Sequence, residues 1–472
     1  MSGSARGRRL VAGFARTGVA VARALGRLGE EVLAIDDAPS PDALAQADRL
    51  GVELVVAPGP ERLAHLVGAV EEVVVSPGLS PAHPVFAAAR SRGVPVISEV
   101  ELAFRLGLPP LVAITGTNGK TTVTSLVAAM LARSGRAVSA AGNIGRPLVD
   151  LAGEPDPAAP GPPRPELVVA EVSSFQLAFC ERFRPTVGTW LNLAEDHLDW
   201  HRDLDDYAAA KARIWARQGP DDVAVANAED AVVLEHARAA RSRLVTFGLA
   251  QGDYRVDGEL LVAAGKGVVA SRADLFRDLP HDRANALAAI ATAVACGASL
   301  DACRRALSEH RPLRHRVELV GRHAGVEYFD DSKATTPSAV IAALAGFGSV
   351  VLIAGGRNKG LDLGAIAEAL RASTRRPEGT AGKSGARLAK LRGVVAIGES
   401  AEALASAFSP EWPVVAAPSM SDAVEAAARL AQPGDAVLLS PGCASFDWYS
   451  SYEERGDDFA RAVKALPALE GR

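Results

Sequence analysis

Short apolar runs that end in glycine or polar residues recur along the chain and alternate with longer helical stretches. In the first hundred residues these runs are 10–12, 32–35, 54–56, 73–75 and 94–97. Strand-like runs that alternate with helical stretches are typical of a parallel sheet with helices on both faces. The pattern therefore predicts an α/β fold, with a first doubly wound domain over residues 1–107.

The same pattern continues through two further units, which we predict at 108–312 and 313–472. Their strand-like runs are 111–114, 167–170, 187–191, 350–354, 394–397 and 436–440, and their clearest helices are predicted at 207–215 and 281–295. A chain of 472 residues is too long for one hydrophobic core, so several domains agree with its length. Because ligands of open parallel sheets bind at the carboxyl ends of the strands, the polar residues that follow each run are site candidates.

One junction of strand, glycine-rich turn and helix stands out at 111–131. Its turn and first helical residues are Gly116, Thr117, Asn118, Gly119, Lys120, Thr121 and Thr122. Backbone N–H groups and the positive end of a helix dipole would face an anion there, with Lys120 on β/γ-phosphate oxygens and Thr121 on Mg²⁺. Ile114 replaces the first glycine of the usual phosphate-binding pattern. A chance Gly-Lys pair at an ordinary junction is the alternative.

Three polar residues after this junction are candidates for metal chemistry. Glu171 follows a buried run, which suits Mg²⁺ because this cation prefers oxygen ligands, although a helix cap or a surface charge is the alternative. His197 lies in an acidic cluster, but a zinc site would require more His or Cys. Lys211 lies on an alanine-rich helical stretch, where a solvated charge is the more common case.

Lysine is scarce in this chain. Lys and Arg total 51, of which only eight are lysines. Lysines retained in such a background are candidates for sites that a planar guanidinium cannot serve. Random scatter is the alternative, and we prefer it for Lys383, Lys390 and Lys464.

Composition and charge exclude several classes of protein. A net charge of −5 gives no general attraction to nucleic acid or anionic membranes, and no apolar segment is long enough to span a bilayer. Four cysteines without metal or disulfide spacing favour the reducing cytoplasm. The arginine-rich start resembles a targeting peptide, but it continues into the first strand without a cleavage site.

Three other segments have less specific predictions. Gly13 and Gly18, with Asp36-Asp37 further on, form an incomplete dinucleotide fingerprint, so we expect a nucleotide-containing ligand. The proline-rich segment 154–165 predicts a mobile surface loop. The basic segment 371–392 predicts a flexible insertion, for which polyanion binding is an alternative to a solvated loop.

Taken together, the motifs resemble the Mur ligases, the ATP-dependent amino-acid ligases of peptidoglycan synthesis. The matching segments are 116–122, 171–177, 192–197, 207–211, 331–335 and 440–456, and the resemblance covers essentially the whole chain. The first segment is shared among the family's branches. Ser174-Phe175-Gln176, the segment 331–335 and Cys443 to Asp447 with Arg455-Gly456 favour the branch that adds D-glutamate to UDP-N-acetylmuramoyl-L-alanine.

The resemblance implies a three-domain fold: a Rossmann-like substrate domain, a central P-loop ATPase-like domain and a Rossmann-like amino-acid-binding domain. It implies catalytic roles for Lys120, Asn143, His197, Lys211 and Lys333. Besides the junction at 116–122, it implies nucleotide contacts for Asn285, Arg316 and Asp331. It implies that the muramoyl substrate and D-glutamate contact Arg16, Thr17, Asp36, Asp37, Ser76, Gly78, Thr335, Lys359, Ser445, Phe446 and Tyr452.

The resemblance also implies two Mg²⁺ ions, with Thr121 and Glu171 on one and His197 and a carbamylated Lys211 on the other. We expect a cytoplasmic monomer that serves cell shape and division and binds no nucleic acid or membrane. Phe446, Tyr452, Asp282 and Thr336 depart from the family's usual Leu, Phe, Asn and Asn. A folylpolyglutamate synthase and a nucleotide-binding regulatory module without catalysis are the competing hypotheses; surplus N-terminal residues argue against the first, and the retained catalytic set against the second.

Overall fold

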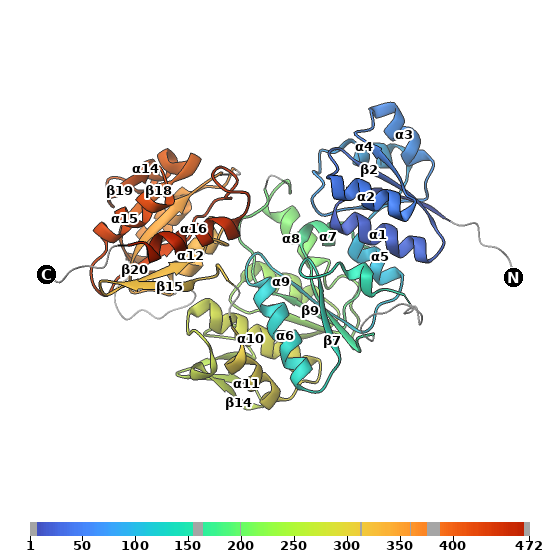
Figure 1. Ribbon diagram of the computed structural model, residues 1–472. Coiled ribbons are helices and arrows are strands. Elements are labelled where there is room, and N and C mark those ends of the chain that lie inside the picture. Colours follow the sequence, from blue (N-terminus) through green and yellow to red (C-terminus); the bar gives the residue numbers. More distant parts are fainter. Residues whose placement is uncertain are drawn as a thin grey trace.

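The computed structural model describes residues 7–153, 164–198, 200–311, 314–358, 360–374 and 388–466. Three α/β units, each built on one sheet, follow one another from the N-terminal to the C-terminal end (Figure 1). The predicted α/β class with parallel sheets is therefore confirmed. The predicted loop at 154–165 lies almost entirely outside the described residues.

The first unit is a five-stranded, fully parallel sheet in the order β3-β2-β1-β4-β5. Its strands are β1 (Arg8–Ala12), β2 (Glu31–Asp36), β3 (Glu53–Val56), β4 (Glu72–Val75) and β5 (Val96–Ser98), and its helices are α1 (Arg16–Arg27), α2 (Pro41–Leu50), α3 (Pro60–Gly68), α4 (Pro84–Arg92) and α5 (Glu99–Arg105). The strand order reverses between β1 and β4, and such a switch point forms a ligand crevice at the carboxyl ends of the strands. There Ser76 donates a hydrogen bond of 2.7 Å to the Gly13 carbonyl.

The middle unit is a nine-stranded sheet in the order β14-β13-β12-β11-β10-β9-β6-β8-β7. Its strands are β6 (Leu111–Thr115), β7 (Val138–Gly142), β8 (Leu167–Glu171), β9 (Val187–Trp190), β10 (Val223–Asn227), β11 (Arg243–Phe247), β12 (Tyr254–Asp257), β13 (Leu260–Ala263) and β14 (Gly267–Ser271). Its helices are α6 (Lys120–Arg133), η1 (Leu148–Leu151), α7 (Ser174–Ala178), α8 (Leu204–Ala212), α9 (Ala231–Ala239), η2 (Arg272–Asp274), α10 (Pro280–Ala295) and α11 (Leu300–Glu309). The last three strands pair as an antiparallel extension that the sequence pattern did not predict.

The third unit is a six-stranded sheet in the order β15-β16-β20-β17-β18-β19, parallel except for the β15–β16 hairpin. Its strands are β15 (Glu318–His323), β16 (Val326–Asp330), β17 (Ser349–Gly355), β18 (Lys390–Ile397), β19 (Val414–Ala417) and β20 (Ala436–Leu439). Its helices are α12 (Pro337–Leu344), α13 (Gly364–Thr374), η3 (Gly398–Ser400), α14 (Ala401–Phe408), α15 (Met420–Leu430) and α16 (Tyr452–Lys464).

Two predicted segments differ from the structure. The helix predicted at 207–215 is α8, which begins earlier because the Asp203 side chain accepts a hydrogen bond from the Asp206 N–H and caps it. Its last turn does not reach Trp215, whose indole N–H donates to the Gly188 carbonyl at 2.8 Å. The two ends of the flexible insertion predicted at 371–392 are regular instead, because α13 extends to Thr374 and β18 begins at Lys390, while 375–387 lie outside the described residues.

The first two units share a hydrophobic core, whereas the third has cores of its own. One cluster of buried residues includes Phe14 of the first unit and Trp190 of the middle unit. The fully buried Glu101 carboxylate accepts three backbone N–H groups, from Glu181, Arg182 and Phe183, at 3.0 Å each. These contacts fix the first unit against the middle one.

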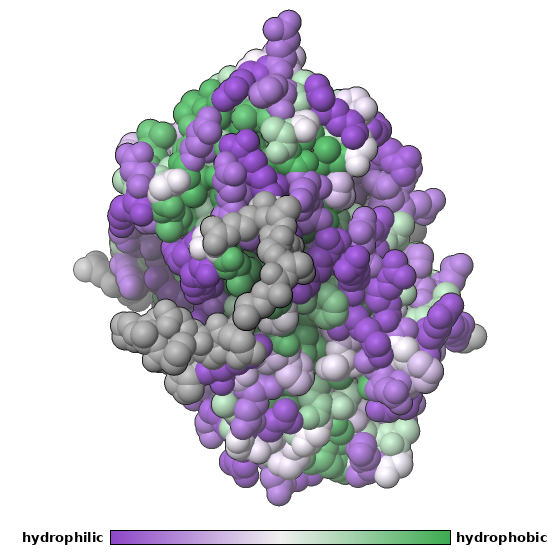
Figure 2. Space-filling model, turned by 90° about the vertical axis from the view of Figure 1, so that its right-hand side faces the viewer, coloured by the Kyte–Doolittle hydropathy of each residue, from purple (hydrophilic) through white to green (hydrophobic). Residues whose placement is uncertain are grey.

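On the face in Figure 2, hydrophilic residues interrupt the apolar areas. Within the described ranges, no helix combines the length and the apolar character that a bilayer crossing requires.

Candidate functional site

Two neighbouring cavities lie where the middle and third units meet. The first cavity, of about 340 Å³, lies between the start of α10 and the segment that leads into β15. The second cavity, of about 720 Å³, is lined by the turn before α6, the ends of β7 and β8, and loops of the third unit. Both cavities include the turn that follows β6, so both lie at the carboxyl ends of parallel strands, where the sequence predicts the site.

The glycine-rich turn before α6 depends on two of its glycines. Gly116 and Gly119 have positive φ angles of 155° and 84°. A Cβ at Gly119 would overlap the Asn285 side-chain oxygen, so the helix can approach only a glycine. Asn192 braces the turn, because its side-chain oxygen accepts the N–H groups of Thr117 at 3.0 Å and Asn118 at 2.8 Å.

Two lysine ammonium groups converge on one carbonyl of this turn. Lys120 Nζ donates to the carbonyls of Gly116 and Thr117 at 3.0 Å each, and Lys211 Nζ donates to Gly116 at 2.9 Å. Lys211 is only 1% exposed, so a solvated surface charge is ruled out. Burial lowers the pKa of Lys211 well below its usual range, Lys120 lowers it further, and Asp196 opposes the shift. Burial likewise lowers the pKa of Lys120.

Glu171 is a buried carboxylate with an oxygen to spare. It is the last residue of β8, and its Oε1 accepts a hydrogen bond of 2.9 Å from the Asn143 side chain. Its Oε2 is buried and has no hydrogen-bond partner among the described residues. Ser173, not Glu171, caps α7, so the helix-cap alternative for Glu171 is wrong. An unpartnered carboxylate oxygen beside Thr121, in the same cavity, fits a hard cation such as Mg²⁺.

His197 and Lys333 face the second cavity from opposite units. His197 Nε2 lies 3.4 Å from a carboxylate oxygen of Asp196, and its ring centroid lies 4.6 Å from that of Phe175. Lys333 Nζ lies 3.6 Å above the centre of the Tyr452 ring, and burial lowers the pKa of Lys333 to about 8. Thr335, Ser445 and Phe446 line the same cavity, while Lys359 lies outside the described residues.

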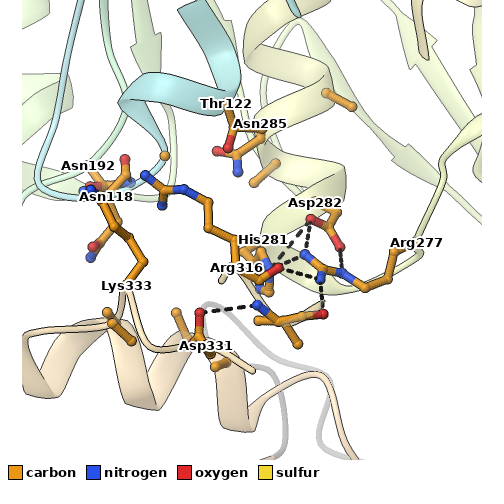
Figure 3. A pocket seen from close by; sticks show the side chains of 18 of the residues that line it. Asn118, Thr122, Asn192, Arg277, His281, Asp282, Asn285, Arg316, Asp331 and Lys333 are labelled. Atoms are coloured by element: carbon orange, nitrogen blue, oxygen red, sulfur yellow. Dashed lines mark hydrogen bonds and ion pairs between the residues drawn. The ribbon is translucent and has the colours of Figure 1, made fainter. Parts of the chain in front are cut away.

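The first cavity holds the predicted nucleotide-contacting residues (Figure 3). Asn285 projects from α10 beside Thr122, and Arg316 and Asp331 face it from the other side. The Asp331 carboxylate accepts hydrogen bonds from Ser440 Oγ at 2.8 Å and from the Val317 N–H at 3.3 Å. Burial raises the pKa of Asp331 to about 7.

The predicted substrate residues of the first unit gather at its switch point. Asp36 accepts a hydrogen bond from the Phe14 N–H at 2.6 Å, and Asp37 Oδ2 lies 3.3 Å from His83 Nε2. Arg16, which precedes Thr17 in the first turn of α1, donates to the carbonyl of Gly145. Because Gly145 lines the second cavity, this contact joins the crevice of the first unit to the cavity.

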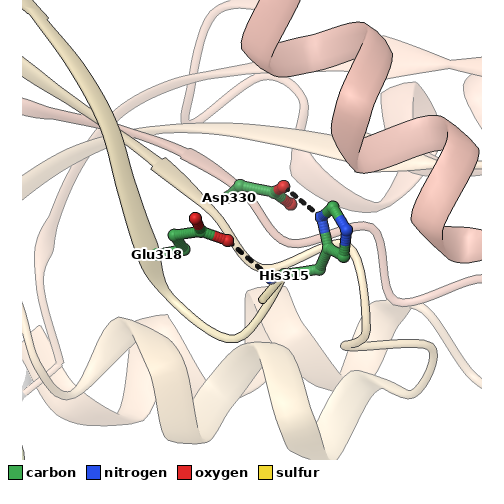
Figure 4. A group of neighbouring side chains, drawn as sticks. All are labelled: His315, Glu318 and Asp330. Carbon is green, nitrogen blue, oxygen red and sulfur yellow. Dashed lines mark hydrogen bonds and ion pairs between the residues drawn. The ribbon is translucent and has the colours of Figure 1, made fainter. Parts of the chain in front are cut away.

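Within the described ranges, one group of side chains lies close enough together to suggest a metal: His315, Glu318 and Asp330 (Figure 4). Their atoms are already hydrogen-bonded. His315 Nδ1 lies 2.6 Å from Asp330 Oδ2, Asp330 Oδ1 accepts the Ser332 N–H at 2.9 Å, and Glu318 accepts the His315 N–H at 2.9 Å. We therefore assign this group to holding the segment before β15 rather than to a metal.

Two residues of the site were not among the predicted contacts. Asn192 lies two residues after the end of β9, so its place at the carboxyl end of a strand was a usable signal. Arg277, which pairs with Asp282 beside the first cavity, follows η2 and is marked by no motif. Its partners are known only from the folded chain.

Sequence comparison finds three family models that match consecutive parts of this chain. The model described as Mur ligase MurD-like, N-terminal domain matches residues 7–98. The Mur ligase middle domain matches residues 114–293, and the Mur ligase, glutamate ligase domain matches residues 315–443.

Curated relatives match over nearly the whole chain. The UDP-N-acetylmuramoylalanine–D-glutamate ligase of Desulfosudis oleivorans is 40% identical over 473 residues, which cover 97% of this chain and 96% of that protein. The protein of the same name from Frankia casuarinae is 42% identical over 470 residues, covering 97% and 93%.

Solved structures agree in fold. The MurF ligase of Thermotoga maritima in complex with ADP aligns with a TM-score of 0.58 at 15% identity, covering 92% of this chain and 95% of that one. MurF from Acinetobacter baumannii aligns with a TM-score of 0.57 at 19% identity, covering 96% and 90%. At these identities the likeness concerns the three-unit fold alone.

Proposed function

Because this chain belongs to the Mur ligase family, we propose that it catalyses the reaction named by its curated relatives, the addition of D-glutamate to UDP-N-acetylmuramoyl-L-alanine. It is an ATP-dependent ligase of peptidoglycan synthesis. The observation that carries the assignment is the second cavity, where the phosphate-binding turn, the spare Glu171 oxygen and the third unit's polar loops face one another.

The arrangement supports an acyl-phosphate mechanism. Lys120 and the backbone N–H groups of the turn bind the ATP phosphates, and the γ-phosphoryl group passes to the L-alanyl carboxylate. The amine of D-glutamate then attacks the activated carbonyl, and phosphate leaves as the amide forms. The turn holds the phosphates at the N-terminus of α6 and so orients this transfer.

We also propose the ligands of two Mg²⁺ ions. The spare oxygen of Glu171 and the Thr121 hydroxyl, both at the second cavity, suit one ion. For the other ion we propose His197 of the same cavity together with a modified Lys211. Bound Mg²⁺ would offset the negative charge that spreads over the transferred phosphoryl oxygens.

Carbamylation of Lys211 is chemically favoured by its surroundings. Burial lowers the pKa of Lys211 and so favours its neutral amine, the form that attacks carbon dioxide. The new N–C bond forms as one C=O π bond opens and a proton leaves nitrogen. The product is an anion, which relieves the repulsion between Lys211 and Lys120.

We assign the substrates to the units as the motifs indicate. Residues 1–107 bind the uridine diphosphate sugar through Arg16, Thr17, Asp36, Asp37, Ser76 and Gly78. Residues 108–312 bind ATP, and residues 313–472 bind D-glutamate through Thr335, Lys359, Ser445, Phe446 and Tyr452. We further propose that the protein is a cytoplasmic monomer that supports wall growth, cell shape and division, since ATP and the uridine diphosphate sugar are both nucleotides of the cytoplasm.

The deciding experiment measures phosphate release by the purified protein with UDP-N-acetylmuramoyl-L-alanine, ATP and Mg²⁺. We expect release with D-glutamate and little with L-glutamate. No release with D-glutamate, or equal rates with both enantiomers, would reject the function. Omission of the muramoyl substrate is the control, because a simple ATPase would still release phosphate.

A further inference from the structure

Residues 315–317, which lie between the middle unit and β15, have an unusual backbone conformation; we refer to them as the segment before β15. His315 and Val317 have positive φ angles of 62° and 48°, and a β-branched residue such as valine rarely adopts this region. Such backbone persists only where its surroundings hold it in place. The residue between them, Arg316, lines both cavities.

Arg277, in the middle unit, donates hydrogen bonds to backbone carbonyls of this segment (Figure 3). Its Nη1 donates to the carbonyl of Arg316 at 2.9 Å and to that of Val317 at 2.5 Å. Its Nε and Nη2 donate to the two carboxylate oxygens of Asp282 at 2.7 Å and 2.9 Å. The pair is largely buried, so Asp282 fixes the guanidinium in the orientation that the two carbonyls require.

From the third unit, two acidic residues hold the same segment. Asp331 accepts the Val317 N–H at 3.3 Å, and Asp330 accepts the His315 ring N–H at 2.6 Å. Arg316 is thus fixed on both sides, and its Nη2 reaches the Thr121 hydroxyl of the phosphate-binding turn at 3.4 Å.

We propose that Arg277 and Asp282 are positioning residues for the ATP site, which fix the backbone of Arg316 and Val317 and thereby aim the Arg316 guanidinium at the turn. This rests on the proposed ATP-dependent function. It also explains Asp282, which stands where the family usually has Asn: a carboxylate offers one oxygen to each of two guanidinium donors, whereas an amide has only one acceptor oxygen.

The first test replaces Arg277 by Met. We expect the KM for ATP to rise about tenfold, because a charge-assisted contact is lost, while the KM for D-glutamate changes less than about twofold. Arg272→Met is the matched control, since Arg272 is similarly exposed and pairs with Asp278 and Glu259 without touching the segment. Arg277→Lys, which keeps a donor, should fall between. A folded Arg277→Met protein with the wild-type KM for ATP would overturn the proposal.

The second test asks whether Arg277 acts through Arg316. The Arg277→Met, Arg316→Met double variant should bind ATP no more weakly than Arg316→Met alone; multiplied losses would contradict the proposal. Asp282→Asn should leave the ratio of KM values for ATP and GTP unchanged, because a changed ratio would mean that Asp282 contacts the base. The affinity of each variant for a fluorescent ADP analogue tests the same comparisons independently of catalysis. If the wild type releases no phosphate, the proposed function is rejected, and the affinities for the ADP analogue still decide this proposal: equal affinities of wild type and Arg277→Met would overturn it.

Discussion

Lys211 is the residue whose surroundings say most about the chemistry. It is buried, it shares the Gly116 carbonyl with Lys120, and its Nζ lies 4.4 Å from the centre of the Tyr207 ring. A permanent ammonium there would repel both Lys120 and any Mg²⁺ in the cavity. These facts support a lysine that works as its carbamate.

We therefore predict that Lys211→Ala lowers the rate of phosphate release by about 10²–10³-fold, the cost of losing one preorganised electrostatic group. Short carboxylic acids should restore part of the rate by supplying the missing carboxylate. Lys266→Ala, at an exposed lysine, should have no effect. Full activity of Lys211→Ala without added acid would reject the carbamate.

Glu99 gives the protein a pH-dependent stability. Its carboxyl is buried at the start of α5, accepts the Val149 N–H at 2.6 Å, and burial raises its pKa from 4.5 to about 7. Between these pH values the folded protein keeps a proton that the unfolded chain releases. Folding stability from this group therefore falls as the pH rises from about 4.5 to 7.

Removal of this carboxyl should flatten that dependence. Glu99→Gln should lose less stability than the wild type between pH 5 and pH 7, by about 2 kcal/mol. Urea unfolding at the two pH values measures the difference. Glu181→Gln, at an exposed glutamate, should follow the wild type. Equal losses in Glu99→Gln and wild type would show that Glu99 ionises normally.

At the scale of elements, α16 packs closely against the segment before β15, and one glycine of the helix makes this close contact possible. A Cβ at Gly456 would collide with His315 Nδ1 and lie 2.5 Å from Asp330 Oδ2. The helix can therefore cover the His315–Asp330 pair only where it has no side chain.

Gly456→Ala should cost about 1–3 kcal/mol, the usual effect of overpacking, and should lower activity because the pair holds Arg316 in place. Thermal unfolding and phosphate release measure the two effects. Gly26→Ala is the matched control, because Gly26 also lies in a helix but has open space at its Cβ. That substitution should stabilise the protein by up to about 1 kcal/mol. If Gly456→Ala behaves like Gly26→Ala, the close fit is not limiting.

The parallel strands could be predicted because both faces are buried, which leaves continuous apolar runs. The antiparallel extension β12–β14 could not, since its strands are short and half-exposed, with Leu260 and Val268 at the surface. The phosphate-binding turn and Glu171 could also be predicted as site candidates, because each lies at the end of a predicted strand. By contrast, the brace from Asn192 to the turn joins residues 75 positions apart, and only the sheet order brings them together.

At the scale of the whole molecule, the shared core of the first two units contrasts with the separate cores of the third. We expect the third unit to move as a body when ATP and the muramoyl substrate bind, because three substrates must meet in one cavity that excludes water.

Small-angle scattering should show a smaller radius of gyration with an ATP analogue plus the muramoyl substrate than with either alone. Lys120→Met, which weakens phosphate binding, is the control and should stay at the ligand-free value. An unchanged radius in the wild type would contradict the closure.

Trp200 lies on the boundary between the first two units. Its indole N–H donates to the Leu79 carbonyl at 3.1 Å, and its ring lies 4.9 Å from that of Phe175. Leu79 follows directly on Ser76 to Gly78, the loop to which we assign the sugar nucleotide. Because this hydrogen bond ties the indole to the loop, we expect the emission of Trp200 to change when the loop binds its ligand, so the protein carries an optical reporter of its own. Occupancy of the loop can be followed by fluorescence without a label, with Trp200→Phe as the blank.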